Sequence, residues 1–398
     1  MPSVPPSSRT GGVVRRMSAR DRGEEHRAST PLELFFDLCF VVAVAQVGGR
    51  LVHAVAAGRP GHGVLGYLTV FFAIWWAWMN FSWFASAYDT DDVPYRVTTL
   101  VQIVGVLMLA AGVPRAFDGG DFRLVAIGYA VMRLALVTQW LRAGVAENGG
   151  ARVTAFHYAC GVAVCQVGLM VLLVPHGAPP VWAFALMAAA ELAVPPLAER
   201  AQPTSWHPGH IAERYGLFTI IVLGESVSAA TVAVQSAADE HGTFGSLVPI
   251  AVGGLLLVFA AWWIYFAVPI EEHLVSSRVA FAWGYGHFAV YASAAAIGAG
   301  LEIAVEHAVG EIDVSTRGAS AAVALPAAVF LFAVWLLNSR RHTRGATQQM
   351  VLPVSAVAVA ACMFTGTHAV LWAGLVCAGT VAVGAVLEER ARAVNHGQ

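Results

Sequence analysis

Long apolar runs separated by short polar segments occupy most of this chain. A run of about 20 apolar residues spans the hydrocarbon core of a bilayer as a helix. Such runs lie at about 33–55, 64–86, 95–113, 122–142, 153–174, 180–199, 211–235, 246–269, 278–300, 319–337, 349–364 and 367–388. The pattern therefore predicts an all-α integral membrane protein with about twelve transmembrane helices.

Composition supports this interpretation and excludes several kinds of site. The 398 residues are 58% hydrophobic and only 12% charged, whereas about 25% of the residues in a soluble protein are charged. The five cysteines lie in apolar runs without metal-ligand spacing. Because no nucleotide loop, nucleophile elbow or zinc signature is present, we expect no cofactor, no metal and no nucleic-acid partner. The expected surroundings are a lipid bilayer.

The arginines predict the orientation in the membrane. All 23 residues of the Lys/Arg type are Arg. With the N-terminus placed inside, seventeen of them fall on the inner side and five on the outer side, as the positive-inside rule requires. We therefore expect a membrane protein with both termini in the cytoplasm. Residues 1–30 and 391–398 are then cytoplasmic tails, and the first, which is polar and rich in Arg, is predicted to be disordered.

An internal repetition predicts two halves. Trp75 and Trp76 in the second run lie 187 residues before Trp262 and Trp263 in the eighth, and Asp37 lies 188 residues before Glu225. Acidic residues and an Arg follow each Trp pair. These cytoplasmic-face charges are Asp89, Asp91, Asp92 and Arg96 in one half and Glu271, Glu272 and Arg278 in the other. Two parallel six-helix repeats, 31–205 and 206–390, explain this order, although chance likeness between apolar segments is the alternative.

The first apolar run carries two carboxylates, Glu33 and Asp37. Four residues apart on a helix, they share one face and are about 40° apart. A carboxylate at the centre of a membrane helix costs about 2.5–3.5 kcal/mol, and less near its end. We interpret Glu33 as an anion that complements the helix dipole. Asp37 lies one turn deeper, and we expect it to act inside the helix bundle.

The seventh run begins with the polar residues Glu213 and Arg214 and then enters the bilayer. Glu225 lies about twelve residues into this helix, close to the middle of the membrane, and the Ser226 hydroxyl follows it. Gly224 would let a neighbouring helix approach closely. An acid at this depth indicates a functional site, although a structural ion pair is the alternative.

Two further polar residues lie within apolar runs. Arg133 needs a partner in the fourth run, and the candidates are Asp37, Glu191, Glu225 and Glu302. A structural pair with Arg133 would make the carboxylate concerned less able to titrate. His287 has an imidazole that could titrate near neutral pH, although a single His in a helix is more often a packed core residue.

Two long motifs resemble one known family. The stretch Thr30-Pro-Leu-Glu33-Leu-Phe-Phe-Asp37-Leu-Cys-Phe-Val-Val-Ala resembles the opening signature of the bacterial low temperature requirement A family, and the stretch from His210 to Ser226 is similar to its second signature. The resemblance runs from about residue 27 to 390. It implies a multi-pass bacterial membrane protein and supplies no substrate or reaction.

Three functions remain open. In a transporter or channel for a small ion or solute, Asp37 and Glu225 line the path, and Arg133 and His287 tune them. In a membrane-embedded enzyme or lipid-handling protein, one pocket at the cytoplasmic face binds a phosphorylated head group through Arg and acidic residues. That pocket would use His210, Glu213, Arg214, Glu271, Glu272 and His273. In a structural stress-adaptation protein, the charges form closed ion pairs.

Overall fold

A computed structural model describes residues 13–24, 27–173, 180–241, 244–340 and 345–396. Twelve helices in these ranges are long and apolar enough to cross a membrane, which confirms the predicted number. They are α1 (Pro31–Ala56), α2 (Pro60–Tyr88), α3 (Val93–Gly119), α4 (Arg123–Ala146), α5 (Gly149–Leu173), α6 (Val181–Ala198), α7 (Pro208–His241), α8 (Phe244–Phe266), α9 (Ser277–Val309), α10 (Thr316–Val334, continued by a π-turn, Trp335–Ser339), α12 (Ala346–Ala361) and α13 (Ala369–His396).

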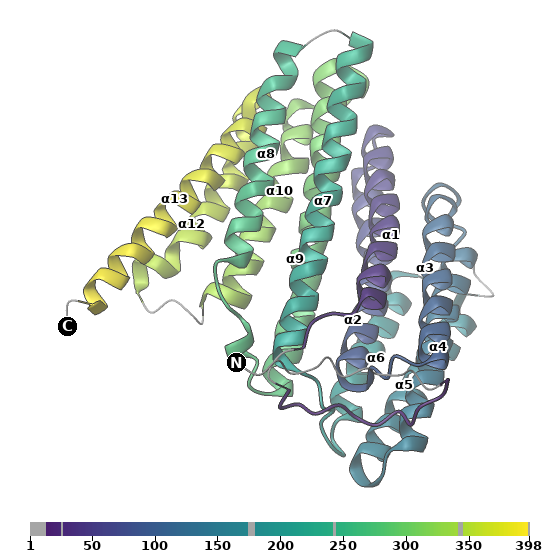
Figure 1. The fold of residues 1–398 in the computed structure, drawn as a ribbon. Helices are drawn as coiled ribbons and strands as arrows, with labels where there is room; N and C mark the ends of the chain where they lie inside the picture. The colour runs from purple at the N-terminus through teal and green to yellow at the C-terminus, as the bar shows by residue number, and fades with distance from the viewer. Residues whose placement is uncertain (1–12, 25–26, 174–179, 242–243, 341–344, 397–398) are drawn as a thin grey trace.

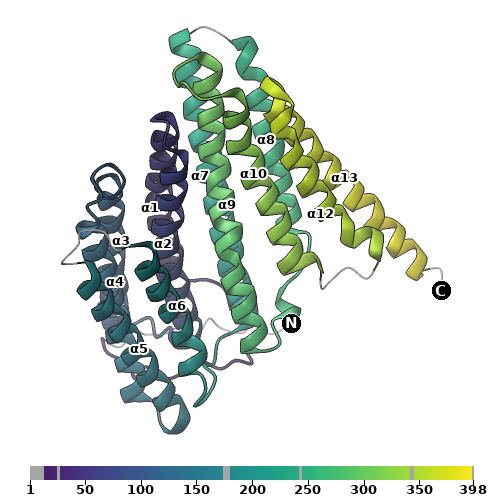
Figure 2. The same ribbon diagram turned by 180° about the vertical axis from the view of Figure 1, so that it is seen from behind.

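The helices form two groups that lie side by side, α1–α6 and α7–α13 (Figures 1 and 2). In the first group α1 packs on α3, α3 on α4, α4 on α5 and α5 on α6. The second group repeats this order, with α7 on α9, α9 on α10, α10 on α12 and α12 on α13. The order differs at the second helix, because α8 packs on α13 whereas α2 packs on α1. The groups meet where α1 and α2 contact α7 and α9.

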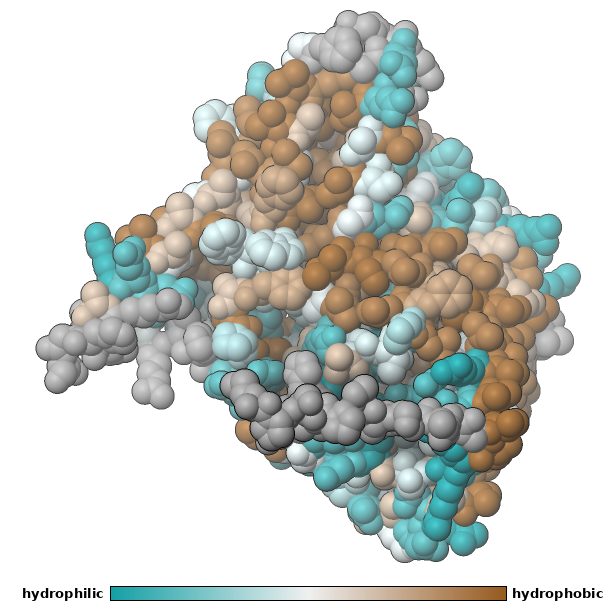
Figure 3. All heavy atoms as spheres, viewed as in Figure 1, coloured by the Kyte–Doolittle hydropathy of each residue, from teal (hydrophilic) through white to brown (hydrophobic). Residues whose placement is uncertain are grey.

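Apolar side chains cover broad areas of the surface, and polar residues gather toward the helix ends (Figure 3). Many large apolar side chains are exposed on the lipid-facing helix surfaces, as expected of helices surrounded by lipid. The two Trp pairs differ in this respect. Trp75 and Trp76 on α2 are buried, whereas Trp262 and Trp263 on α8 are half exposed.

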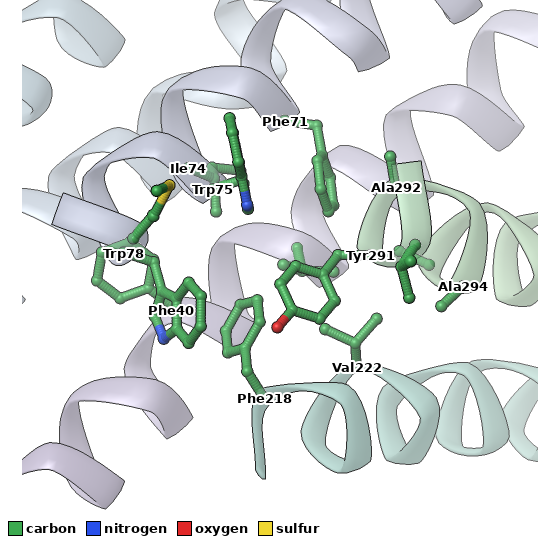
Figure 4. Close-up of a cluster of buried hydrophobic side chains, with 14 of the residues drawn as sticks. Phe40, Phe71, Ile74, Trp75, Trp78, Phe218, Val222, Tyr291, Ala292 and Ala294 are labelled. Atoms are coloured by element: carbon green, nitrogen blue, oxygen red, sulfur yellow. The ribbon is translucent and has the colours of Figure 1, made fainter. Parts of the chain in front are cut away.

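Aromatic rings fill the junction between the two groups (Figure 4). The Trp78 ring of α2 stacks on Phe218 of α7 with 4.3 Å between centroids, and it meets Tyr291 of α9 edge-on at 5.6 Å. Phe40 of α1 and Phe71 of α2 lie in the same buried cluster. Rings at these distances attract each other beyond the burial of their area, so this aromatic cluster joins the two groups at mid-depth.

The close approach of two pairs of helices depends on glycine. A Cβ on Gly253 of α8 would lie 2.4 Å from the Val370 carbonyl oxygen of α13. A Cβ on Gly298 of α9 would lie 2.8 Å from the Ser226 Cα of α7. The expectation for Gly224 is wrong, because nothing lies within 4 Å of a Cβ built there. The α7–α9 approach therefore depends on Gly298 and the adjacent Ser226.

The N-terminal segment packs on one end of the bundle, which we call the tail side and which is the lower end in Figure 1. Met17 is buried, the Arg20 amide donates to Ala87 O (2.9 Å), and Arg27 donates to Ala85 O (2.6 Å) and Ser86 O at the end of α2. The expected disorder of residues 1–30 is therefore wrong for 13–24 and 27–30. Residues 1–12 lie outside the described part of the chain.

The expectation of a separate C-terminal tail at 391–398 is also wrong for 391–396, because α13 continues as a helix to His396. Residues 397 and 398 lie outside the described residues.

Candidate functional site

The start of α1 places Glu33 and Asp37 inside the bundle. Thr30 caps this helix: its hydroxyl accepts from the Glu33 amide (3.3 Å), and the Glu33 carboxylate accepts from the Thr30 amide (2.8 Å). This reciprocal capping box satisfies two backbone donors at the helix start, and Pro31 favours the first helical position. Both carboxylates are fully buried. Glu33 therefore has the capping role expected of it, and it also faces a second helix.

That second helix is α7, which presents His210 and Arg214 with the same spacing of four residues. His210 Nε2 lies 3.2 Å from Glu33 Oε1, and Arg214 Nη1 lies 3.3 Å from the same oxygen. Arg214 Nη2 lies 2.5 Å from Asp37 Oδ1. All four side chains are fully buried. We call Glu33, Asp37, His210 and Arg214 the charge cluster.

Helix α2 completes the surroundings of this cluster. Trp78 donates its indole N–H to Asp37 Oδ1 (2.7 Å), and Arg214 donates to the Ser82 hydroxyl (3.2 Å). Trp78 also belongs to the aromatic cluster, which therefore adjoins the charge cluster directly. A carboxylate that accepts from both a guanidinium and an indole is held more firmly than one in a single pair.

The charge cluster retains unused hydrogen-bonding atoms. Within the described residues, Glu33 Oε1, Asp37 Oδ2, His210 Nδ1, and Arg214 Nε and Nη1 are buried without a hydrogen-bond partner of good geometry. Structural ion pairs in a low-dielectric interior are stable when such atoms are satisfied. The unused atoms therefore leave this cluster able to bind a further small polar species or to rearrange.

A second pair of opposite charges lies toward the tail side of the cluster. Arg27 and Asp89 are buried there, and both interact electrostatically with Glu33. Burial, aided by the negative charge of Glu33, raises the pKa of Asp89 to about 6. Burial lowers the pKa of the Arg27 guanidinium. The charged region therefore extends from the buried cluster to the end of the bundle.

Arg133 forms a separate site within the first group of helices. Its Nη2 lies 2.5 Å from Glu191 Oε2 of α6, one of the four partners considered from the sequence. Glu191 also accepts from the Trp76 indole (2.9 Å) and the Tyr129 hydroxyl (3.3 Å). Arg133 is thus paired away from Asp37 and Glu225, and the structure does not bring it to the proposed path.

His287 is also placed away from the carboxylates. Its Nδ1 donates to Trp283 O (2.8 Å), and its Nε2 accepts from the Tyr265 hydroxyl (3.0 Å). Both ring nitrogens are therefore satisfied by neutral groups, and the ring lies edge-on to Tyr215 with 4.9 Å between centroids. This arrangement is that of a packed core histidine, which was the alternative considered for it.

Glu225 lies further along the face of α7 that carries Arg214. Eleven residues separate the two, which is about 16 Å along a helix and about 20° around it. Glu225 is partly buried, and no ion pair or hydrogen bond reaches it within the described residues. Asp37 and Glu225 are therefore not at equivalent depths. Ser226 donates to Val222 O (3.1 Å) and Ala294 O (3.0 Å), which joins α7 to α9.

The tail-side charges form local pairs or remain exposed. Asp89 pairs with Arg20 (3.4 Å), Asp91 with Arg96 (2.8 Å), and Asp92 with Arg142. Glu213 accepts from the Ser29 amide (3.2 Å). Glu271, Glu272 and Arg278 are exposed, whereas His210 and Arg214 are buried. The residues considered for an enzyme pocket therefore lie in two different environments.

The molecule is thus a multi-pass helical membrane protein with a buried charge cluster where its two helix groups meet. The comparisons with known proteins agree. The chain belongs to the family described as bacterial low temperature requirement A protein (LtrA), whose model matches residues 28–386. It is also similar to the uncharacterized protein RA0937 of Rhizobium meliloti (strain 1021), with 28% identity over 255 residues. The match covers 62% of this chain and 60% of that protein.

Proposed function

We propose that this protein is a transporter for a small ion and that the charge cluster is its proton- or cation-binding site. The observation that carries the proposal is the buried excess of negative charge where the two helix groups meet. An ionisable group inside a membrane protein is expensive and usually marks an ion pathway or a proton relay. Here four such groups meet on two facing helices.

The charge balance supports a bound proton or monovalent cation. Three buried carboxylates share this region with two buried guanidiniums: Glu33, Asp37, Asp89, Arg27 and Arg214. Arg20 also reaches Asp89, but it is paired with Glu24 at 2.6 Å, so these two side chains together add no net charge. One negative charge therefore remains. In a low-dielectric interior it is neutralised most readily by one proton, on His210 or on a carboxylate, or by one bound cation.

The two-group architecture supports movement around this site. Apart from the second helix of each group, the helices of both groups pack in the same order, which supports the duplication inferred from the sequence. In transporters built from repeats, binding sites lie at the interface of the repeats, and one repeat rocks against the other. The aromatic cluster adjoins the charge cluster in the direction of Glu225. We propose that it forms the barrier between the tail side and the opposite side, and that Glu225 lies beyond it on the path.

The arginine distribution assigns the tail side to the cytoplasm under this proposal. The alternative, an enzyme at the cytoplasmic face, needs one pocket that contains His210, Arg214, Glu271 and Glu272. The burial of the first two and the exposure of the last two do not favour it.

The test is proton and potassium flux in proteoliposomes that contain the full-length chain. We expect Asp37→Asn and Glu225→Gln each to abolish or uncouple the flux, whereas Glu272→Gln, an exposed carboxylate on the tail side, keeps it. Because Asp37→Asn leaves Arg214 without its closest anion, the double variant Asp37→Asn with Arg214→Gln is measured as well. Absence of flux in correctly folded wild-type protein, or full flux in both Asp37 variants, would refute the assignment.

A further inference from the structure

A second site lies among aromatic rings near the tail side, where helices of the first group meet α9, and it shares no residue with the charge cluster. Five helices and the α6–α7 link line a small, partly open cavity of about 20 Å³. Its wall contains the rings of Trp76, Trp83, Trp140, Tyr158 and Phe281, together with Asn80 and Thr204. A space of this size holds one particle of about the size of a water molecule, for which about 10–15 Å³ is enough.

A buried carboxylate without a cationic partner adjoins this cavity. Glu199, at the end of α6, is 9% exposed. Its Oε1 accepts from two residues of the cavity wall, the Thr204 hydroxyl (2.6 Å) and the Tyr158 hydroxyl (3.2 Å). Its Oε2 is buried without a hydrogen-bond partner of good geometry among the described residues, although the Ser277 hydroxyl also interacts with the carboxylate.

Glu199 differs in this respect from the other buried acids. Glu33, Asp37, Asp89, Asp92 and Glu191 each have an arginine within 4 Å, whereas no ion pair involves Glu199 in the described part of the chain. A buried ionised carboxylate without a counter-charge is costly. Consistent with this cost, burial raises the pKa of Glu199 above its ordinary value. A cation in the adjacent cavity would remove the cost.

The cavity wall also offers an unused acceptor. Asn80 donates its amide N–H to Trp76 O (2.8 Å), which fixes the orientation of its amide group. The Asn80 amide oxygen then makes no hydrogen bond to any described residue. The wall therefore combines aromatic rings, an unused amide oxygen and an adjacent carboxylate, and it contains no cationic side chain. Aromatic rings attract cations, and the two oxygens attract N–H donors.

We propose that this cavity binds an ammonium-type cation, either the ammonium ion or the –NH₃⁺ group of a small primary amine. An ammonium ion has the size of a water molecule and can donate an N–H to the unused amide oxygen of Asn80 in the wall, and its positive charge offsets that of the Glu199 carboxylate behind Tyr158 and Thr204. A potassium ion of similar radius is attracted by the same oxygens and rings but has no N–H to donate, so it is the control that separates hydrogen bonding from charge alone. Each additional methyl group on the nitrogen removes a donor and adds volume, so tetramethylammonium is excluded.

Trp206 is a buried ring beside the cavity wall. Its ring packs against Trp83 with 5.3 Å between centroids, and the Arg22 guanidinium lies 4.6 Å from the Trp206 ring centre. A cationic group from the N-terminal segment thus already lies over an aromatic ring beside the cavity wall.

The test is the melting temperature of the purified full-length chain in detergent, with the chlorides of ammonium, methylammonium, tetramethylammonium, potassium and sodium at equal ionic strength. We expect ammonium and methylammonium to raise the melting temperature beyond the other three salts, because a ligand that binds the folded state stabilises it. Glu199→Gln should weaken this binding by about tenfold or more, as loss of a charged hydrogen-bond partner does. Glu272→Gln should leave it unchanged.

Equal effects of all five salts, or an unchanged ammonium effect in Glu199→Gln, would overturn the proposal. If potassium raised the melting temperature as much as ammonium does, the assignment of the ligand to ammonium-type cations would be overturned. If Glu199→Gln does not fold, Thr204→Val and Asn80→Ala carry the same test. This binding does not depend on the charge cluster, so it can be present when proton flux is absent, and the two proposals can fail separately.

Discussion

Arg214 on α7 joins two successive turns of α1, because its Nη2 lies 2.5 Å from Asp37 Oδ1 and its Nη1 lies 3.3 Å from Glu33 Oε1. One guanidinium therefore holds both carboxylates of the first helix, and it does so across the boundary between the two helix groups. The position is 177 residues from Asp37, the same separation that relates His210 to Glu33. The two helices thus pair through matched spacings of four residues.

Loss of this guanidinium should destabilise the protein strongly. We expect Arg214→Gln to lower the free energy of unfolding by about 3–5 kcal/mol, because it leaves two buried carboxylates without their shared cation. Unfolding of the purified chain in detergent, followed by near-ultraviolet circular dichroism, measures the change. The double variant Arg214→Gln with Asp37→Asn should recover part of the loss. If the losses of the two single variants simply add in the double variant, the side chains do not act as a pair.

The second buried ion pair should respond unequally to removal of its two members. Without Arg133, Glu191 keeps the Trp76 and Tyr129 donors. Without Glu191, Arg133 remains buried with its charge, because a guanidinium does not lose its proton. We therefore expect Glu191→Leu to cost about 3–5 kcal/mol, as loss of a buried partner does, and Arg133→Met to cost less. Equal losses in the same unfolding measurement would contradict this account.

The sequence predicted the helices more completely than it predicted their contacts. Length and hydropathy were enough to predict twelve spans, and the cost of burying charge was enough to select Asp37, Glu225 and Arg133. Neither property tells which helices touch. Asp37 was therefore aligned with Glu225, whereas its partner is Arg214. The sequence did contain a signal for this pairing: the two acids of α1 are four residues apart, and so are His210 and Arg214 of α7.

The N-terminal segment was misjudged for a related reason. Its polarity and its arginines are typical of disorder, but its contacts use arginine donors and backbone amides rather than a hydrophobic face. Arg15 donates its amide to Asp92 (2.7 Å), and Ala19 donates its amide to Glu147 (2.6 Å). Such contacts depend on where helix ends and acidic loops lie in space, which local composition does not indicate.

Arg27 should contribute to stability more than an exposed arginine does. It donates to the last carbonyls of α2, Ala85 O and Ser86 O, and it is buried. We expect Arg27→Ala to cost about 1.5–3 kcal/mol, the value of hydrogen bonds to a charged donor. Arg96→Ala, which removes only the exposed pair with Asp91, should cost less than Arg27→Ala, because exposed ion pairs contribute little. Thermal unfolding of both variants measures the difference, and equal effects would show that the N-terminal segment does not pack on α2.

Asp89 should make stability depend on pH. Its pKa is about 6 in the folded protein against a reference of 3.8, so the folded state binds the proton more tightly than the unfolded state does. The contribution of Asp89 is therefore fully present below about pH 4 and is lost as pH rises through about 6. We expect the stability of Asp89→Asn relative to wild type to increase by about 1–3 kcal/mol over this interval. Parallel pH profiles for the two proteins would contradict the shift.

Two glycines of the second helix group should respond oppositely to the same substitution. A Cβ on Gly298 would lie 2.8 Å from the Ser226 Cα, and backbone atoms of a packed helix cannot move aside cheaply. We expect Gly298→Ala to cost about 1–3 kcal/mol through overpacking. Gly224→Ala meets nothing within 4 Å and should stabilise α7 by about 0.5–1 kcal/mol, because alanine loses less backbone freedom. Thermal unfolding compares them directly. A tolerated Gly298→Ala would mean that α7 and α9 are not held this close, and the Ser226 hydrogen bond to Ala294 O would then be in question as well.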